Sequence, residues 1–246
     1  MPPTPPSIVD ERRKVYSKVL QLEAPILAAL ADWPELDIRL AEARRIKPSR
    51  PELSAVDLVM GQIFTESGGN PFARGLAGEL GLMQLMPSTA RDMGLDIPPS
   101  GFTPEEVYRW SEAARLNHAG SLPPLIFLPE VNIKAGVGYM HRVYLLLRAR
   151  GWSGDAFSTY RLALAGYNGG PAYILAAIKN KVGEEMLDEA PVLQAIRESR
   201  VKLGGTKRMS DGKVMPVERT APPAMARYPE TVFDHAAAIA TVRAAK

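Results

Sequence analysis

This sequence of 246 residues contains no cysteine. Without thiols the chain cannot form disulfides, thiolate nucleophiles or cysteine-based metal sites. No run approaches the roughly 18 apolar residues that identify a membrane span. The first residues, MPPTPPSIVDERRKVY, lack the apolar core of a signal peptide. We therefore expect no membrane span. If the target of the protein lies outside a cytoplasm, we expect something other than a signal peptide to deliver the protein to it.

The sequence also has little excess of charge of one sign, because its 30 Lys and Arg residues and 27 Asp and Glu residues leave a formal net charge of only +3. The Lys and Arg residues are scattered without interleaved aromatic residues, so nucleic-acid binding is not expected. His118, His141 and His235 show no metal-ligand spacing, and neither a metal nor another cofactor is expected. The hydrophobic content of 46% is that of an ordinary globular protein with a sizeable core.

Apolar residues recur at helical spacing along most of the sequence, which predicts a mainly α protein with at most a small β-hairpin. The clearest helix is 52–66, where Val56, Val59, Ile63 and their neighbours form one apolar stripe before the glycines of SGGNP. Two or three helices are expected within 8–46, and others at 87–93, 104–117, 131–150, 155–166, 171–180 and 230–244. An Asp-Gly pair within 204–226 predicts the hairpin.

Prolines divide this helical pattern. Pro48 and Pro51 follow the first helices, so residues 1–50 are predicted to form an N-terminal helical extension and residues 51–246 the main domain. Many prolines fall within 94–130, and this stretch is predicted to be an inserted excursion from the main domain.

Glu66, at the end of the predicted helix 52–66, is the first candidate for chemistry. Val59, Ile63 and Glu66 share one face, so the acid continues an apolar stripe. Burial and the carboxyl end of a helix both raise the pKa of a carboxyl group, as a general acid near neutral pH requires. For a lone glutamate a solvated helix end is the commoner situation, so the position alone does not decide.

The residues around Glu66 belong to a longer pattern. It comprises Glu66-Ser67, Asn70-Pro71, Gly81-Leu82-Met83-Gln84 and Met86-Pro87, followed by PEVNIKAGVGYM at 129–140 and Ala163-Leu164-Ala165-Gly166-Tyr167-Asn168. These three motifs, in this order, resemble the lytic transglycosylase SLT domain, a lysozyme-like family. The resemblance covers about residues 50–180. It implies a mainly α, lysozyme-like fold, here with extra N-terminal helices.

The resemblance also implies roles for individual residues. Glu66 would be the catalytic acid. Gln84, with a donor and an acceptor, and Met86, as an apolar wall, are expected to bind substrate, whereas core packing is the expected role of Met83. Tyr167 is expected to stack on a sugar or bond the acid, and Asn168 to bond an N-acetyl group.

Two positions depart from the commonest family pattern. Gly75 stands where the family usually has a serine that orients substrate, and Glu79 stands where it often has alanine. Glu79 is either a structural loop carboxylate or an auxiliary acid that tunes Glu66 or positions a water. The late family motif Glu-Thr-x-x-Tyr is present only as Glu230-Thr231.

The resemblance predicts an enzyme that cleaves the β-1,4 bond between N-acetylmuramic acid and N-acetylglucosamine in peptidoglycan. A single glutamate would act as acid and base and leave 1,6-anhydro-muramyl ends. Three alternatives stay open: hydrolysis as in goose-type lysozymes, peptidoglycan endopeptidase activity on the same fold, and non-catalytic wall binding. The expected partner is the peptidoglycan glycan strand, and the expected oligomeric state is a monomer.

The predicted place of action is the cell wall, in the periplasm. Because the sequence shows no signal peptide, we expect a phage enzyme that is carried in the virion or released at lysis. A bacterial enzyme whose signal segment is absent from this sequence is the other option.

Overall fold

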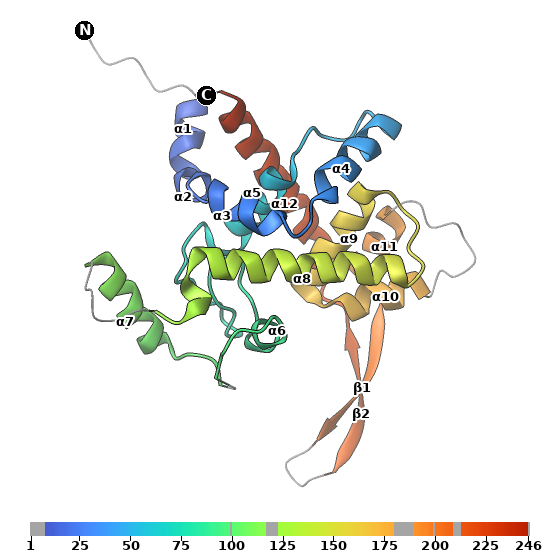
Figure 1. Cartoon of the computed structure of the whole chain (residues 1–246). Helices are drawn as coiled ribbons and strands as arrows, with labels where there is room; N and C mark the ends of the chain where they lie inside the picture. The colour runs from blue at the N-terminus through green and yellow to red at the C-terminus, as the bar shows by residue number, and fades with distance from the viewer. Residues whose placement is uncertain are drawn as a thin grey trace. The chain divides into compact units, whose positions relative to one another are not determined.

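The computed structural model describes residues 8–98, 100–116, 123–179, 189–198, 200–208 and 213–245. Its elements in order are α1 (Ile8–Val15), α2 (Ser17–Leu20), α3 (Glu23–Leu30), α4 (Glu35–Ile46), α5 (Ala55–Ser67), α6 (Pro87–Asp92), α7 (Pro104–Arg115), the 3-10 helix η1 (Leu125–Phe127), α8 (Pro129–Ala149), α9 (Ala156–Gly169), α10 (Pro171–Lys179), α11 (Ala190–Arg197), β1 (Lys202–Arg208), β2 (Val214–Thr220) and α12 (Ala224–Ala244). Figure 1 shows this mainly helical architecture. Among the described residues no helix is both long and apolar enough to cross a membrane.

The predicted mainly α class with a small β-hairpin is confirmed. Strands β1 and β2 pair antiparallel, with Lys202 opposite Thr220 and Arg208 opposite Val214. The Asp-Gly pair that predicted this hairpin, Asp211-Gly212, lies outside the described residues.

Some helix boundaries differ from those predicted. The segment before residue 50 forms four helices, α1 to α4, rather than two or three. Helix α9 extends through Gly169, so Tyr167 and Asn168 belong to its last turn instead of a linker. Helix α12 begins at Ala224, ahead of the predicted residue 230, and it continues through Pro229, which lies inside the helix. Helix α11 was not predicted.

The chain forms two compact units, and helices α4, α8 and α12 each continue from one unit into the other. The first unit comprises Met1–Ile38, Pro48–Tyr139 and Val232–Lys246, and the second comprises Arg39–Lys47 and Met140–Thr231.

Helix α5 forms the centre of the first unit. Every residue from Ala55 to Ile63 is buried, so the helix is enclosed on all sides over its first two turns and more. Gly61 permits the closest contact: a Cβ atom built there would lie 2.6 Å from the carbonyl oxygen of Val232 and 2.8 Å from the amide of Ala236. Only glycine therefore lets the α12 backbone approach α5 this closely.

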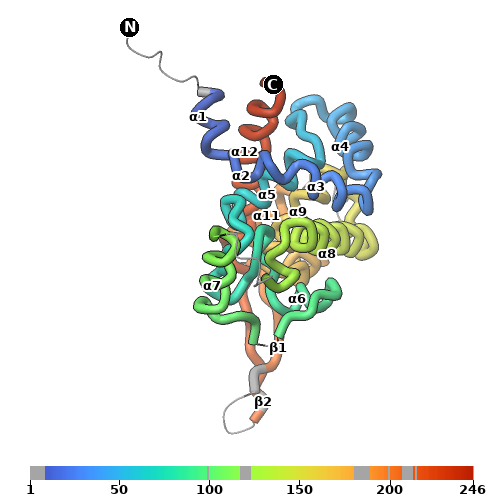
Figure 2. The backbone as a smooth tube through the Cα atoms, turned by 60° about the vertical axis from the view of Figure 1, so that its left-hand side comes forward, coloured from blue at the N-terminus to red at the C-terminus, as the bar shows by residue number. Residues whose placement is uncertain are grey.

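The two ends of the described chain meet within this unit. Figures 1 and 2 both draw the last part of α12, in red, beside the helices α1 and α2, in blue. The Tyr16 hydroxyl lies 3.0 Å from Nδ1 of His235, and both rings contact Phe64 edge-on, at centroid distances of 4.6 and 4.7 Å. Burial lowers the pKa of His235 and raises that of Tyr16. Both are therefore neutral near pH 7, with Tyr16 as the hydrogen-bond donor.

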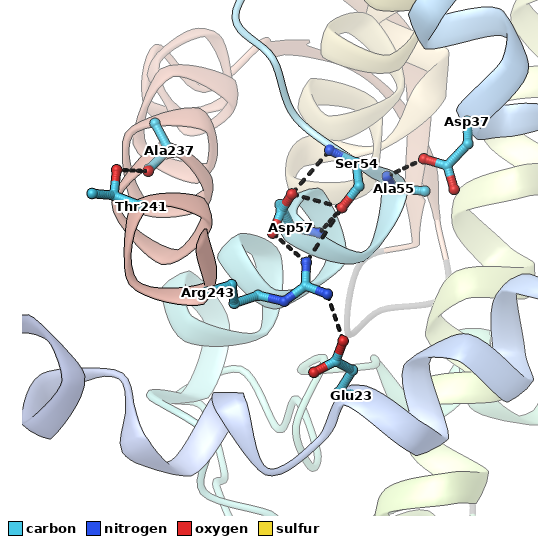
Figure 3. Close-up of polar contacts among 8 residues, drawn as sticks. All are labelled: Glu23, Asp37, Ser54, Ala55, Asp57, Ala237, Thr241 and Arg243. Atoms are coloured by element: carbon cyan, nitrogen blue, oxygen red, sulfur yellow. Dashed lines mark hydrogen bonds and ion pairs between the residues drawn. The ribbon is translucent and has the colours of Figure 1, made fainter. Parts of the chain in front are cut away.

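The N-terminus of α5 is held by a polar network that reaches across this unit (Figure 3). Ser54 and Asp57 form a reciprocal capping box, and Asp37 accepts a hydrogen bond from the Ala55 amide at 2.6 Å. Asp57 is buried and is met by Arg243, whose Nη1 donates to Oδ1 at 2.6 Å. The same guanidinium donates to Glu23 at 2.5 Å.

We expect Arg243→Ala to destabilise the protein by about 3 kcal/mol, because the substitution leaves the Asp57 carboxylate buried without its charge partner. Denaturant unfolding monitored by circular dichroism measures the change. Glu23→Gln is the matched control: the Glu23–Arg243 pair is more exposed, and its loss should cost less than about 1 kcal/mol. Equal effects of the two substitutions would contradict this account of Asp57.

The second unit has a separate buried centre that contains much of α9. The Trp152 indole donates to the Thr159 hydroxyl at 3.1 Å, and the Ser158 hydroxyl donates to the buried Glu189 carboxylate at 2.6 Å. Arg161 lies 3.5 Å from the other oxygen of Glu189. These contacts position the helix that carries Tyr167 and Asn168 at its end.

Candidate active site

Glu66 lies where the buried helix α5 emerges from the core. Residues up to Ile63 are buried, and Glu66 in the last turn is half-buried. Gly68 then ends the helix in the left-handed conformation, with φ 60°, and its amide donates to the Phe64 carbonyl at 2.9 Å. Gly69, with φ 78°, has no room for a side chain, because a Cβ atom would lie 2.8 Å from Cβ of Lys18 on α2. The glycines thus end the helix immediately after the acid.

The loop that follows Glu66 is closed upon itself by hydrogen bonds. The Gly81 amide donates to the Ala73 carbonyl at 2.9 Å. The Gln84 side-chain amide donates to the same carbonyl at 3.2 Å and to the Gly81 carbonyl at 2.8 Å. Both N–H groups of Gln84 are therefore used within the loop, and Oε1 is the atom left to accept a further hydrogen bond.

Gln84 also has an unusual backbone conformation. Its φ is +45°, and among the described residues it is the one non-glycine with a positive φ. Such a conformation costs on the order of 1 kcal/mol and persists only where the surroundings impose it. Strained residues cluster at functional sites, so this observation marks the loop as a candidate site.

The surroundings that impose this conformation include Asn132 on α8. Its side chain is fully buried and accepts a hydrogen bond from the Met83 amide at 2.8 Å. It donates to the Leu80 carbonyl at 3.2 Å and to the Ile126 carbonyl at 2.9 Å. Asn132 thereby holds the backbone on both sides of Gly81 and fixes the loop against α8.

The Gly-Leu-Met-Gln segment packs tightly against the same helix. A Cβ atom at Gly81, where φ is 77°, would lie 2.1 Å from Nδ2 of Asn132. Met83 is fully buried and lies so close to Gly136 that a Cβ atom there would be 2.2 Å from its sulfur. The core role expected for Met83 is confirmed. Met86, by contrast, is 40% exposed at the start of α6.

The two departures from the family pattern meet in space. A Cβ atom at Gly75 would lie 2.1 Å from Oε2 of Glu79 and 3.0 Å from Oε1 of Gln84. The Glu79 carboxylate therefore occupies the space that a serine at position 75 would need. Its Oε2 also accepts a hydrogen bond from the Ala77 amide at 3.0 Å. The glycine and the glutamate are thus two parts of one local arrangement.

Tyr167 and Asn168 lie in the second unit. Tyr167 is half-buried and Asn168 is exposed, both in the last turn of α9. The helix ends at Gly170, where φ is 100° and the amide donates to the Gly166 carbonyl at 2.8 Å. Ala163 and Ala165 of the same motif are fully buried, so they serve packing rather than ligand contact.

The structure thus brings together some of the predicted residues within one unit. Glu66, Glu79, Gln84 and Met86 all belong to the first unit, on α5 and the loop after it. No group of three His, Cys, Asp or Glu side chains among the described residues is arranged to hold a metal ion. The structural role of Asn132 was not predicted from the sequence. A single polar residue next to Ile133 in an otherwise apolar part of the helix could have indicated it.

Part of the chain that carries this geometry matches the model of a known family. Residues 47–109 match the family model described as the Transglycosylase SLT domain, and this range includes Glu66, Glu79, Gln84 and Met86. The predicted resemblance to this lysozyme-like family is therefore confirmed for the matched part of the chain.

Among solved structures, the chain matches the 70 kDa soluble lytic transglycosylase SLT70 of Escherichia coli. The two are 18% identical with a TM-score of 0.42, and the match covers 94% of this chain but 30% of SLT70. A search of curated proteins finds no match to the chain.

Proposed function

We propose that the protein is a lytic transglycosylase that cleaves the β-1,4 bond between N-acetylmuramic acid and N-acetylglucosamine in peptidoglycan. One observation carries the proposal. Within the segment that matches the SLT domain, a half-buried glutamate ends a core helix, and the loop behind it is held rigidly with a strained Gln84. A wall-degrading enzyme of this kind would act on glycan strands in the cell wall.

Glu66 would serve as both acid and base. In the first step its carboxyl proton passes to the glycosidic oxygen as the bond to the muramyl C1 breaks, and the substrate's own acetamide stabilises the cation. In the second step the carboxylate takes the proton from the muramyl 6-hydroxyl, whose oxygen bonds to C1. The glutamate is regenerated, no water is consumed, and the product carries a 1,6-anhydro ring.

Gln84 and Met86 are proposed to bind the sugar chain. Because both N–H groups of Gln84 are bonded to the loop, the residue would accept a hydrogen bond at Oε1 from a sugar hydroxyl or acetamide N–H. Met86 is exposed enough to offer its side chain as an apolar wall. Tyr167 and Asn168 are proposed to bind substrate as well, by stacking on a ring and by bonding an N-acetyl group.

The experiment that tests this proposal is mass spectrometry of muropeptides released from purified peptidoglycan. We expect 1,6-anhydro-muramyl ends and no new reducing ends. New reducing ends would establish hydrolysis instead. Cleaved stem peptides on intact glycans would establish an endopeptidase. Binding to the sacculus without any product would leave a wall-binding protein.

Hydrolysis is the second candidate, and one observation favours it. Glu79 places a second carboxylate in the loop, beside Gly75 and Gln84, where it would take the proton from an attacking water molecule. Its hydrogen bond from the Ala77 amide argues for a structural role in the loop.

We expect Glu79→Gln to change the rate of bond cleavage by less than about tenfold, because the amide oxygen can still accept from Ala77. Muropeptide products of wild type and variant, compared by mass spectrometry, measure the effect. If Glu79 activates water, reducing ends should instead disappear with the substitution. Gly75→Ser is a companion test. Alone, the substitution should displace the Glu79 carboxylate and lower the melting temperature. Combined with Glu79→Ala, which removes that carboxylate, it should regain the lost thermal stability.

The remaining sequence predictions are part of this proposal. Residues 1–50 would be a helical extension and residues 51–246 the catalytic domain, with 94–130 inserted. The proposed working state is a monomer. Delivery in a virion or at phage lysis stays a prediction, as does a bacterial origin.

A further inference from the structure

We propose that a shallow pocket between α7 and the loop after Glu66 binds a free carboxylate of the peptide stem of peptidoglycan. This proposal rests on the proposed function. The pocket lies in the first unit and has a volume of about 280 Å³. Its lining comprises Phe72, Arg74, Pro104, Val107, Tyr108 and Ser111.

The walls of this pocket are fixed by aromatic packing. Phe72 in the loop stacks on Phe127, with ring centroids 5.6 Å apart, and Phe102 packs against Trp110 of α7 at 5.1 Å. Phe102 and Trp110 each contact Phe127 at 5.8 Å. The helix α7 is thereby attached to the loop that follows Glu66, so a ligand would find both sides of the pocket already in place.

Arg74 supplies the charge of the pocket. Its Nε donates to the Phe102 carbonyl at 3.0 Å, which fixes the plane of the guanidinium. Its terminal nitrogens make no hydrogen bond or ion pair with another described residue. Glu106 on α7 is engaged elsewhere, because its Oε2 accepts from the amide of Thr103 at 2.7 Å and from the hydroxyl at 2.9 Å. A guanidinium fork held in this way is suited to a carboxylate.

The rest of the lining indicates a peptide rather than a bare anion. Pro104, Val107, Tyr108 and Ser111 lie on one face of α7, at the i, i+3, i+4 and i+7 positions. They offer an apolar surface, a hydroxyl and a phenol ring that is 67% exposed. Among the residues that the structure describes, no carboxylate lines the pocket, so an acidic ligand meets no repulsion from these walls. The volume is near the lower limit of ligand pockets, which suits one or two amino-acid residues.

The pocket is adjacent to the Gln84 arrangement. Ala73, between Phe72 and Arg74, is the residue whose carbonyl accepts hydrogen bonds from Gln84 and Gly81. Arg74 directly follows Ala73 in the chain, and the Cα atoms of the two residues are therefore about 3.8 Å apart. A muramyl residue bound at Gln84 would carry its peptide stem, attached through the lactyl group, to the neighbouring pocket.

Binding of a synthetic stem tripeptide, measured by isothermal titration calorimetry, tests the proposal directly. We expect the peptide with free carboxylates to bind about tenfold more tightly than the same peptide with amidated carboxylates. Arg74→Gln should remove this difference, while Arg109→Gln, which removes a cation of α7 outside the pocket lining, should preserve it. Arg74→Lys, which retains the charge, should preserve part of it. Equal affinity of wild type for the two peptides would overturn the proposal.

A kinetic comparison shows whether the pocket serves the reaction. We expect Arg74→Gln and Tyr108→Ala to raise KM about tenfold on strands that bear stems and to leave KM unchanged on strands stripped by an amidase. Melting curves check that the variants fold. If stripped glycan displaces the tripeptide, the pocket binds sugar and the proposal is wrong. If wild type cleaves neither strand but retains its preference for the free carboxylates, the proposed function fails and the pocket assignment stands.

Discussion

Glu66→Gln is expected to reduce the release of muropeptides from purified peptidoglycan by at least about 1,000-fold. General acid–base catalysis by one side chain contributes roughly 10²–10⁴ in rate, and here both chemical steps depend on the same carboxyl group. Glutamine has the shape of glutamate and can accept hydrogen bonds, but it can neither give its proton to the leaving oxygen nor take one from the 6-hydroxyl. The measurement is a time course of soluble products by liquid chromatography with mass detection.

The structure supplies controls for this substitution. Glu66 is half-buried at the end of α5, beyond the fully buried part of the helix, so the glutamine variant should melt within a few degrees of wild type. Glu79→Gln removes a carboxylate from the same loop and should retain most of the activity. A Glu66→Gln variant that still degrades peptidoglycan at an appreciable rate would rule out Glu66 as the acid.

Asn132→Leu is expected to lower the free energy of unfolding by about 4 kcal/mol, because the Met83 amide and the Ile126 carbonyl lose their partner and each loss costs about 1–3 kcal/mol, while the Leu80 carbonyl keeps its hydrogen bond from the Leu85 amide. The same substitution should lower kcat by about 100-fold in the molecules that stay folded, since displacement of a positioned group by about 1 Å has such an effect. We expect release of the Met83 amide to let the neighbouring Gln84 leave its positive φ, which would displace its side chain. Chemical unfolding and a kcat measurement well below the melting temperature separate the two effects.

Lys134 on the same helix provides the matched control. Its ammonium group pairs with Asp32 at 3.4 Å, and both side chains are exposed. Lys134→Ala should therefore change stability by less than about 0.5 kcal/mol and leave kcat unaltered. An Asn132→Leu variant with the stability and kcat of wild type would show that the loop does not need this side chain.

The sequence predicted the elements whose signals are local. The apolar stripe of α5 and its glycine stop both lie within a few residues of one another, so the helix and its end were found. Its start at Ala55 was placed a few residues early, since Ser54 caps the helix through Asp57 and this depends on side-chain geometry. Helix α11 was not predicted, because its apolar residues Val192, Leu193 and Ile196 occupy only eight positions.

Contacts between distant residues could not be predicted in the same way. The sequence showed Gly75 and Glu79 as two separate departures from a family pattern, while the fold places the carboxylate beside the glycine. Asn132 bonds to the carbonyl of Leu80 and the amide of Met83, and backbone groups have no residue-specific signature. Of the candidate site, the residue types were therefore predictable, whereas the hydrogen bonds that orient Gln84 required the fold.

The contact between Arg243 and Asp57 has a consequence for protein synthesis. The two residues are 186 positions apart, so a ribosome working at about 5–20 residues per second delivers the arginine roughly 10 to 40 s after the aspartate. During that interval α12 has not yet been synthesised, so the apolar residues of α5 and the surface around Gly61, against which α12 packs, stay uncovered. The first unit is therefore expected to complete its folding late in translation, and a nascent chain halted before α12 should be a strong client of chaperones.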